Sequence, residues 1–150
     1  MFKKICIIGC GLIGSSLARA IKTNNLAEKI VSSNRSTFVN NKVIELKIVD
    51  DSSADTRKMV EGSDLIIIAT PLSSYEEVIL QIKDSLKSGA ILTDVGSVKE
   101  NIINLVEKSI PENVSWISSH PIAGTEDSGP ESGFSELFKN RWCILTPSKK

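Results

Sequence analysis

The feature that most constrains this chain is a glycine-rich turn directly after an apolar run near the N-terminus. Residues 5–8 are continuously apolar, which is typical of a strand buried on both faces of a sheet. Gly9-x-Gly11-x-x-Gly14 follows at once, and an amphipathic stretch over residues 12–21 comes next. The three glycines therefore fall at a strand-to-helix turn, where close backbone approaches would be blocked by larger side chains.

This spacing predicts a dinucleotide-binding turn. Gly9 permits the tight turn, Gly11 leaves room for a pyrophosphate beside the backbone, and Gly14 lets the helix pack close to the strand. The helix start at Leu12 and Ile13 then points free N–H groups and the positive end of the helix dipole at the pyrophosphate. A glycine turn without a ligand is the alternative, but the flanking strand and helix favour dinucleotide binding.

Apolar runs and helical periodicity alternate along the rest of the chain. Strand-like runs are predicted at residues 3–8, 29–33, 64–70, 90–95, 114–118 and 142–146, with a marginal one near Ile48. Most of these runs are separated by a segment of helix length. The alternation predicts an α/β, doubly wound, mostly parallel sheet with the Rossmann NAD(P)-binding fold. We assign residues 1–147 to this dinucleotide-binding domain and residues 148–150 to the start of a linker.

Two short motifs predict helix starts. Ser73-x-x-Glu76 and Ser97-x-x-Glu100 both have the form of a capping box. Apolar residues recur behind each motif at helical spacing, which predicts a buried stripe on each helix. The stripes comprise Tyr75, Val78, Ile79, Ile82 and Leu86 for the first helix, and Val98, Ile102, Leu105 and Val106 for the second.

Composition excludes several function classes. The chain has 150 residues with 18 basic and 18 acidic side chains and no long basic block, which argues against nucleic acid or an anionic membrane as partner. No apolar stretch approaches the length of a membrane span or a signal-peptide core. Cys6, Cys10 and Cys143 are odd in number and lack metal-ligand spacing, so we predict no metal site. Unpaired thiols fit the reducing cytoplasm, and we expect Cys10 to pack within the turn.

In a parallel sheet, the loops that follow the strands meet at one edge, where ligands bind. Four predicted loops lead to that edge: residues 9–14, 34–36, 69–71 and 94–99. Thr70 and Pro71 are expected near the nicotinamide ribose. Asp94 is expected to stabilise its loop or to contact the cofactor. A fifth segment follows the strand predicted at 114–118 and carries the only histidine of the chain, His120.

The second loop bears on cofactor choice. An acidic residue about 20 positions past the glycine turn usually binds the ribose 2′-hydroxyl of NAD. Here that place holds Asn34, followed by Arg35 and Ser36. Guanidinium and hydroxyl donors suit a 2′-phosphate, which a carboxylate would repel, so NADP is predicted in preference to NAD. The alternative is that Arg35 is a solvated surface residue while Asn34 serves the ribose.

Taken in order, these segments resemble the prephenate and arogenate dehydrogenase family. The resemblance runs from residue 5 to residue 147. The glycine turn and the strand at 64–71 are shared with many dehydrogenases, whereas Asp94-Val95-Gly96-Ser97-Val98-Lys99 and His120-Pro121-Ile122-Ala123-Gly124-Thr125-Glu126, with Ser128-Gly129, are specific. The resemblance implies oxidative decarboxylation of prephenate to 4-hydroxyphenylpyruvate, or of arogenate to tyrosine, a step in tyrosine biosynthesis.

The resemblance also implies residue roles. His120 would accept the proton of the substrate hydroxyl, a task that imidazole performs without large tuning of its basicity. Ser97 would lie beside the histidine or the substrate hydroxyl, or else act only as a helix N-cap. Thr125 and Glu126 would face the substrate pocket, with a purely structural loop as the alternative. The role of Lys99 stays open.

Family members continue into a helical domain that supplies much of the dimer interface and the recognition of the substrate carboxylate. The resemblance therefore implies that this chain is the N-terminal domain of a larger homodimeric dehydrogenase, able to bind cofactor but with little turnover alone. Two alternatives remain open: another dehydrogenase or reductase of the same fold, such as a pyrroline-5-carboxylate reductase type, and a nucleotide-binding module without catalysis. The choice between prephenate and arogenate also stays open.

Overall fold

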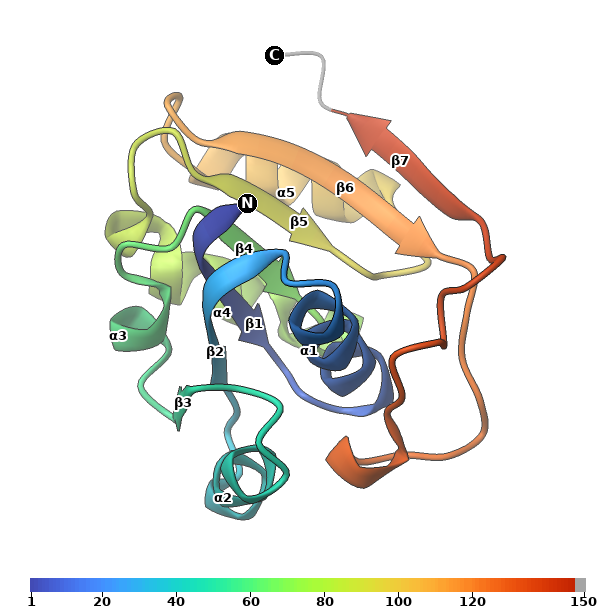
Figure 1. The fold of residues 1–150 in the computed structure, drawn as a ribbon. Coiled ribbons are helices and arrows are strands. Elements are labelled where there is room, and N and C mark those ends of the chain that lie inside the picture. The colour runs from blue at the N-terminus through green and yellow to red at the C-terminus, as the bar shows by residue number, and fades with distance from the viewer. Residues whose placement is uncertain (148–150) are drawn as a thin grey trace.

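The computed structural model describes residues 1–147, which form one seven-stranded sheet with helices on both faces (Figure 1). The strand order is β3-β2-β1-β4-β5-β6-β7, and all neighbours pair in parallel except β6 and β7. The predicted doubly wound, mostly parallel α/β fold is confirmed; residues 148–150, predicted to begin a linker, lie outside the described residues. The strands are β1 (Phe2–Ile8), β2 (Ala27–Ser33), β3 (Asp51–Ser53), β4 (Leu65–Ile68), β5 (Ile91–Asp94), β6 (Ser115–Pro121) and β7 (Cys143–Pro147).

The helices lie on the two faces of this sheet. Figure 1 shows α1 in front of the sheet and α5 behind it. Within residues 1–147, no helix is long and apolar enough to span a membrane. The helices are α1 (Leu12–Thr23), α2 (Thr37–Glu45), α3 (Thr56–Val60), α4 (Tyr75–Ile82) and α5 (Glu100–Ser109), with short 3-10 turns η1 (Leu72–Ser74), η2 (Lys83–Ser85) and η3 (Pro130–Ser132).

Two apolar cores form because successive side chains of a strand point to opposite faces. In β1, Ile5 and Ile7 join a cluster with Ala18 and Ile21 of α1. Cys6 and Ile8 point the other way, into a cluster built with α3, α4 and α5. The continuous apolar run that marked β1 in the sequence is thus explained by burial on both faces.

The marginal strand predicted near Ile48 is wrong in position. Ile48 and Val49 are buried in the turn between α2 and β3, where they pack with Val43 of α2. The strand itself is the polar segment Asp51–Ser53, which pairs with β2. The apolar character of Ile48 therefore reflects packing under a helix.

The two predicted capping boxes are not formed. The helix expected after Ser73 begins at Tyr75, behind the 3-10 turn, and the Ser74 hydroxyl donates to the Pro71 carbonyl at 2.7 Å. The helix expected after Ser97 begins at Glu100, so the prediction that Ser97 is its N-cap is wrong. Val98, predicted to be buried, is 55% exposed because it precedes the helix.

The apolar stripes behind those motifs are largely as predicted. Tyr75, Val78, Ile79 and Ile82 are buried, and Leu86 packs against the same core. On α5, Ile102 and Val106 are buried and Leu105 is half-buried. Periodicity therefore identified the buried faces even where the start of the helix was misplaced.

Backbone hydrogen bonds continue the parallel ladders past the ends of the strands. The Gly9 amide donates to the Ser33 carbonyl at 2.9 Å, and the Ala69 amide donates to the Ile8 carbonyl at 2.8 Å. The Val95 amide donates to the Ile68 carbonyl at 3.2 Å. The loops after β1, β2, β4 and β5 are thereby held side by side at the carboxyl edge of the sheet.

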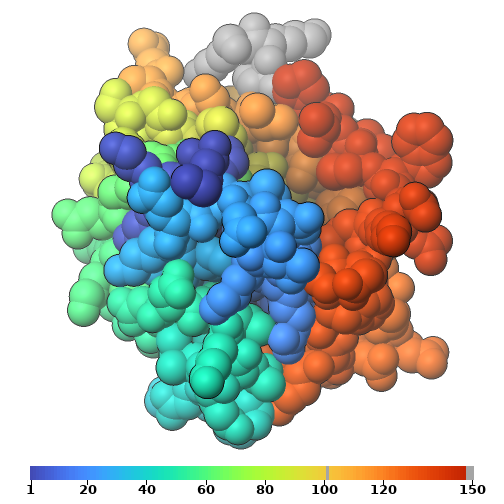
Figure 2. Space-filling view, viewed as in Figure 1, coloured from blue at the N-terminus to red at the C-terminus, as the bar shows by residue number. Residues whose placement is uncertain are grey.

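A long connection, residues 122–142, joins β6 to the antiparallel strand β7; we call it the return segment. It contains η3 and packs against α1, where the Phe134 amide donates to the Ser16 hydroxyl at 3.1 Å. Arg19 of α1 donates to the Pro130 carbonyl, also at 3.1 Å. Figure 2 shows this orange-to-red segment beside the blue surface of α1. The return segment thus reaches the carboxyl edge of the sheet near the glycine turn.

We predict that Gly14→Ala strongly destabilises the fold. A Cβ at Gly14 would lie 2.0 Å from the Gly9 carbonyl oxygen, so α1 would have to move away from β1. Overpacking of this kind typically costs about 1–3 kcal/mol, and we expect a loss of at least that size in the free energy of unfolding measured with urea. Gly11→Ala is the matched control, because among the described residues no atom lies within 4 Å of a Cβ there. Equal unfolding midpoints for the two variants would contradict this account.

Candidate cofactor and active site

A cleft of about 400 Å³ opens at the carboxyl edge of the sheet, where β1 and β4 lie side by side. The chain leaves β1 toward β2 and β3 on one side, whereas β4 and the later strands lie on the other, so the cleft is at the topological switch point. Three of the predicted loops meet in its walls. The lining residues include Gly9, Gly11, Asn34, Arg35, Ser36, Thr70 and Pro71.

The glycine turn leaves the start of α1 open to the cleft. Gly11 is the N-cap residue of α1 and is exposed, and within residues 1–147 no side chain caps this end of the helix. Leu12 and Ile13 follow in the first turn, which carries no acidic residue. The free N–H groups and the helix dipole therefore favour an anion at this point, as a pyrophosphate requires.

Thr70 provides a second indication that the cleft accommodates a polar ligand. Its hydroxyl oxygen is buried and finds no hydrogen-bond partner among the described residues, although buried hydroxyls are normally satisfied. Thr70 lies against Gly9, where an added Cβ would be 2.9 Å from its methyl group. A ligand with a donor or acceptor beside the Gly9 turn would satisfy this hydroxyl, so the residues present fit a dinucleotide.

The Asn34 side chain stabilises the glycine turn in this structure. Its side-chain oxygen accepts from the Cys10 amide at 2.6 Å, and its side-chain nitrogen donates to Asn40 at 3.0 Å. Asn40 in turn donates to the Asn34 carbonyl at 2.8 Å. Because Asn34 is only 8% exposed, its amide serves the protein, and no local residue pattern indicates this inward role.

Arg35 and Glu77 form an ion pair across the mouth of the cleft, linking the end of β2 to α4. Both side chains are largely exposed, so the pair is open to exchange with other charged groups. The neighbouring Ser36 hydroxyl accepts from the Val39 amide at 3.4 Å and caps α2. Glu77 was not singled out in the sequence, because only the fold brings α4 opposite Arg35.

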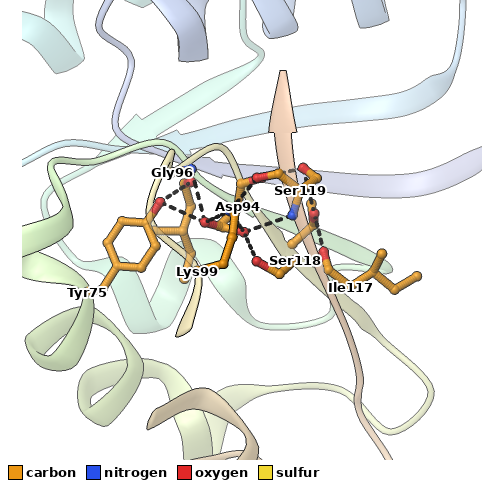
Figure 3. A network of polar contacts seen from close by, with 9 residues as sticks. Tyr75, Asp94, Gly96, Lys99, Ile117, Ser118 and Ser119 are labelled. Carbon is orange, nitrogen blue, oxygen red and sulfur yellow. Dashed lines mark hydrogen bonds and ion pairs between the residues drawn. The ribbon is translucent and has the colours of Figure 1, made fainter. Parts of the chain in front are cut away.

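Asp94 lies at the centre of a buried polar network at the end of β5 (Figure 3). Its carboxylate accepts from the Gly96 amide at 3.0 Å and from Lys99 Nζ at 2.9 and 2.7 Å. The Tyr75 hydroxyl donates to it at 3.3 Å. Burial raises the pKa of Tyr75, which keeps the phenol protonated as a donor.

The same carboxylate also reaches across to β6. It accepts from the Ser118 hydroxyl at 2.8 Å and from the Ser119 amide at 3.0 Å. Asp94 is 0% exposed. The contacts of Asp94 support its predicted role in stabilising the loop, and its predicted contact with the cofactor stays a prediction.

His120 lies within β6, near its end, where it is paired with Ile144 of β7, and not after the strand as predicted. It is half-buried, and within residues 1–147 its imidazole makes no recorded hydrogen bond. Ser97 is exposed on the neighbouring loop after β5. Both residues belong to the carboxyl edge of the sheet, but neither lines the cleft described above.

Thr125 and Glu126 are exposed on the return segment. The Thr125 hydroxyl accepts from the Asp127 amide at 3.2 Å, a local turn that supports the structural alternative for this residue. Gly129 and Pro130 of the same segment line the cleft and were not predicted as site residues. Their contribution depends on the return segment packing on α1, a long-range contact that leaves no local signal in the sequence.

Comparison with known proteins agrees with this site. Residues 17–150 match the model of the nucleotide-binding domain of prephenate dehydrogenase. The chain belongs to the prephenate dehydrogenase family. The resemblance noted in the sequence is thereby confirmed.

Curated members of the prephenate dehydrogenase family align with almost the whole chain. A cyclohexadienyl dehydrogenase of Zymomonas mobilis is 37% identical over 98% of the chain and 50% of its own length. A prephenate dehydrogenase of Lactococcus lactis is also 37% identical, over 96% of the chain and 41% of its own length. The chain spans about half the length, or less, of these relatives.

Solved structures of the family agree closely with this fold. A prephenate dehydrogenase of A. aeolicus, solved in complex with hydroxyphenyl propionate and NAD+, has a TM-score of 0.91 and 27% identity, covering 100% of this chain and 52% of that one. An arogenate dehydrogenase of Synechocystis has a TM-score of 0.85 and 29% identity, covering 97% and 50%. A pyrroline carboxylate reductase of Plasmodium falciparum, with a TM-score of 0.70 and 19% identity over 99% and 49%, shares the fold alone.

The thiols give a test of the packing at the glycine turn. Burial raises the pKa of Cys6 to about 12 and that of Cys10 to about 11, whereas Cys143 is exposed. We predict that a thiol-reactive dye near neutral pH modifies Cys143 rapidly and the other two cysteines only after denaturation. Cys143→Ser should abolish the rapid phase, and rapid labelling of that variant would show that the turn around Cys10 is open.

Proposed function

We propose that this chain is the nucleotide-binding part of an NAD(P)-dependent dehydrogenase that oxidatively decarboxylates prephenate or arogenate. The observation that carries the proposal is the cleft at the switch point, with an uncapped α1 start, open space at Gly11 and an unpartnered Thr70 hydroxyl. Family membership assigns the reaction class, and the cleft supports binding of its cofactor.

Different residues of the cleft are assigned to different parts of the cofactor. The α1 N–H groups beside Gly11 would hold the pyrophosphate, because the helix end is both uncapped and positive. Thr70 and Pro71 follow β4, on the side of the cleft nearer to β5 and β6. They are assigned to the nicotinamide ribose. When bound, the nicotinamide supplies the hydride acceptor.

His120 is the proposed proton acceptor. Within the described residues its imidazole has no hydrogen-bond partner, so a ring nitrogen is free to accept the proton of the substrate hydroxyl. In the balanced reaction, the carbon bearing that hydroxyl gives up a hydride and becomes a carbonyl. The carboxylate leaves as carbon dioxide and its bonding pair completes the aromatic ring. The electrons of the carbonyl double bond move to the oxygen, which takes back the proton held by His120. Ser97, on the adjacent loop, is assigned to hold the substrate hydroxyl or the imidazole.

We predict that His120→Asn in the full-length protein lowers kcat by about 10²–10⁴-fold, the usual contribution of a general base. The dissociation constant of the cofactor should stay within about threefold of the wild-type value, since His120 does not line the cleft. Steady-state kinetics with prephenate and with arogenate, together with cofactor titration, measure both quantities. A variant that retains most of its turnover would refute the assignment.

We propose NADP as the preferred cofactor. Asn34 stands where a carboxylate would repel a 2′-phosphate, and the exposed Arg35 follows it at the edge of the cleft. Binding of the phosphate would require Arg35 to exchange the Glu77 carboxylate for phosphate oxygens. Because both side chains are mostly exposed, this exchange costs little.

The test is Arg35→Gln, which we expect to weaken NADP binding about tenfold or more while leaving NAD binding unchanged. Isothermal titration of this chain with each cofactor measures the two dissociation constants. Lys58→Gln is the matched control, because it removes one exposed positive charge outside the cleft. Tighter binding of NAD than of NADP by the wild-type chain would contradict the preference.

We also propose a cellular compartment and an oligomeric state for the whole protein. All three cysteines are unpaired in the described part of the chain, which supports a reducing compartment, the cytoplasm. A homodimer built through a further helical domain rests on the family resemblance. Exposed apolar side chains on and beside β7, including Trp142 at 83% and Leu145 at 62%, are in keeping with additional packing at this edge.

A further inference from the structure

The ammonium group of Lys99 is fully engaged inside the protein. Its three N–H donors match three acceptors: the two Asp94 carboxylate oxygens, at 2.9 and 2.7 Å, and the Ser119 carbonyl, at 2.5 Å. The Lys99 side chain is 18% exposed and Asp94 is 0% exposed. Lys99 therefore has no donor left for a substrate. Its role must come from the segments that it holds together.

Lys99 and Asp94 connect the two segments that carry the proposed reaction. Lys99 lies two positions after Ser97, on the loop that leaves β5. Its third acceptor, Ser119, immediately precedes His120 in β6. One buried ion pair thus ties the Ser97 loop to the backbone that presents His120 (Figure 3).

The contacts of Asp94 begin where the backbone pairing of β5 with β6 ends. The parallel register of β5 and β6 runs through Ile91, Leu92 and Thr93, and the last pair is Thr93 with Ile117. From Asp94 onward the strands are joined by side chains, because the Asp94 carboxylate accepts from the Ser118 hydroxyl and the Ser119 amide. The Ser119 hydroxyl donates back to the Asp94 carbonyl.

We infer that Lys99 and Asp94 are positioning residues that fix His120 and Ser97 relative to each other. The inference rests on the proposed function, because it assigns a purpose to the spacing of those two groups. Displacement of a catalytic group by about 1 Å can cost about 10²-fold in rate, so an anchor this close to His120 acts on kcat. The cofactor cleft is built from other residues, and its affinity should be unaffected.

The test uses the double variant Asp94→Asn/Lys99→Met, in which the pair is removed without leaving a buried charge unpaired. We expect the full-length variant to melt cooperatively and to bind NADP within about threefold of wild type, with kcat lowered by about 10²-fold. Lys99→Arg keeps the charge but cannot reproduce the three-point contact of an ammonium. Its kcat should therefore lie between that of the wild type and that of the double variant. Lys108→Met, an exposed site on α5, is the control for loss of a lysine.

A second readout comes from His120 itself, since it is the only histidine of the chain. In this 150-residue chain the imidazole NMR signals are unique, and we expect them to shift or broaden in the double variant and not in Lys108→Met. Wild-type kcat and unchanged imidazole signals in the double variant would overturn the inference. So would a loss of kcat matched by an equal loss of NADP affinity, because that pattern indicates a general structural role. Failure of the proposed function is distinguished by His120→Asn, which would then retain turnover whatever the Lys99 variants do.

Discussion

Parallel pairing of β1 with β2 on one side and with β4 on the other is the constraint on which the site depends. It places the Gly9 turn between two strand ends and leaves the start of α1 facing the gap. Backbone bonds from Gly9 and Ala69 extend the ladder past the strands, so the backbone at these two walls of the cleft is held by the same kind of hydrogen bond as the sheet. Cofactor recognition then requires little beyond an open helix end and small residues at the turn.

Two polar residues at this edge, Asn34 and Asp94, act as anchors. Each is almost completely buried. Asn34 accepts from the Cys10 amide in the loop after the neighbouring strand β1, whereas Asp94 accepts from Gly96 of its own loop and from Ser119 of β6. A buried polar group that lost such partners would cost about 1–3 kcal/mol, so these networks hold the loops in one arrangement. Ligand contacts are thereby left to backbone N–H groups and to more exposed side chains such as Arg35.

The sequence was most informative where local chemistry decides the structure. Apolar runs located every described strand except the polar β3, and the glycine spacing located the cleft, because burial on both faces and close backbone approach leave direct traces in residue type. Local patterns failed where tertiary contacts win: Ser97 fits a capping box, yet the loop is held by Lys99 and Asp94, and the helix starts later. The full burial of Asp94 could not be predicted, since two of its partners, Ser118 and Tyr75, lie on β6 and α4.

The return segment joins the strand that carries His120 to one wall of the cofactor cleft in a single continuous stretch of backbone. It leaves β6 two residues after His120, presses Pro130 against the cleft and is tied to α1 through Ser16 and Arg19. A dinucleotide bound in the cleft would lie beside Pro130 of this segment. His120 and one wall of the cleft therefore stand on a single stretch of chain, which fixes their order along the backbone without a relay of side chains.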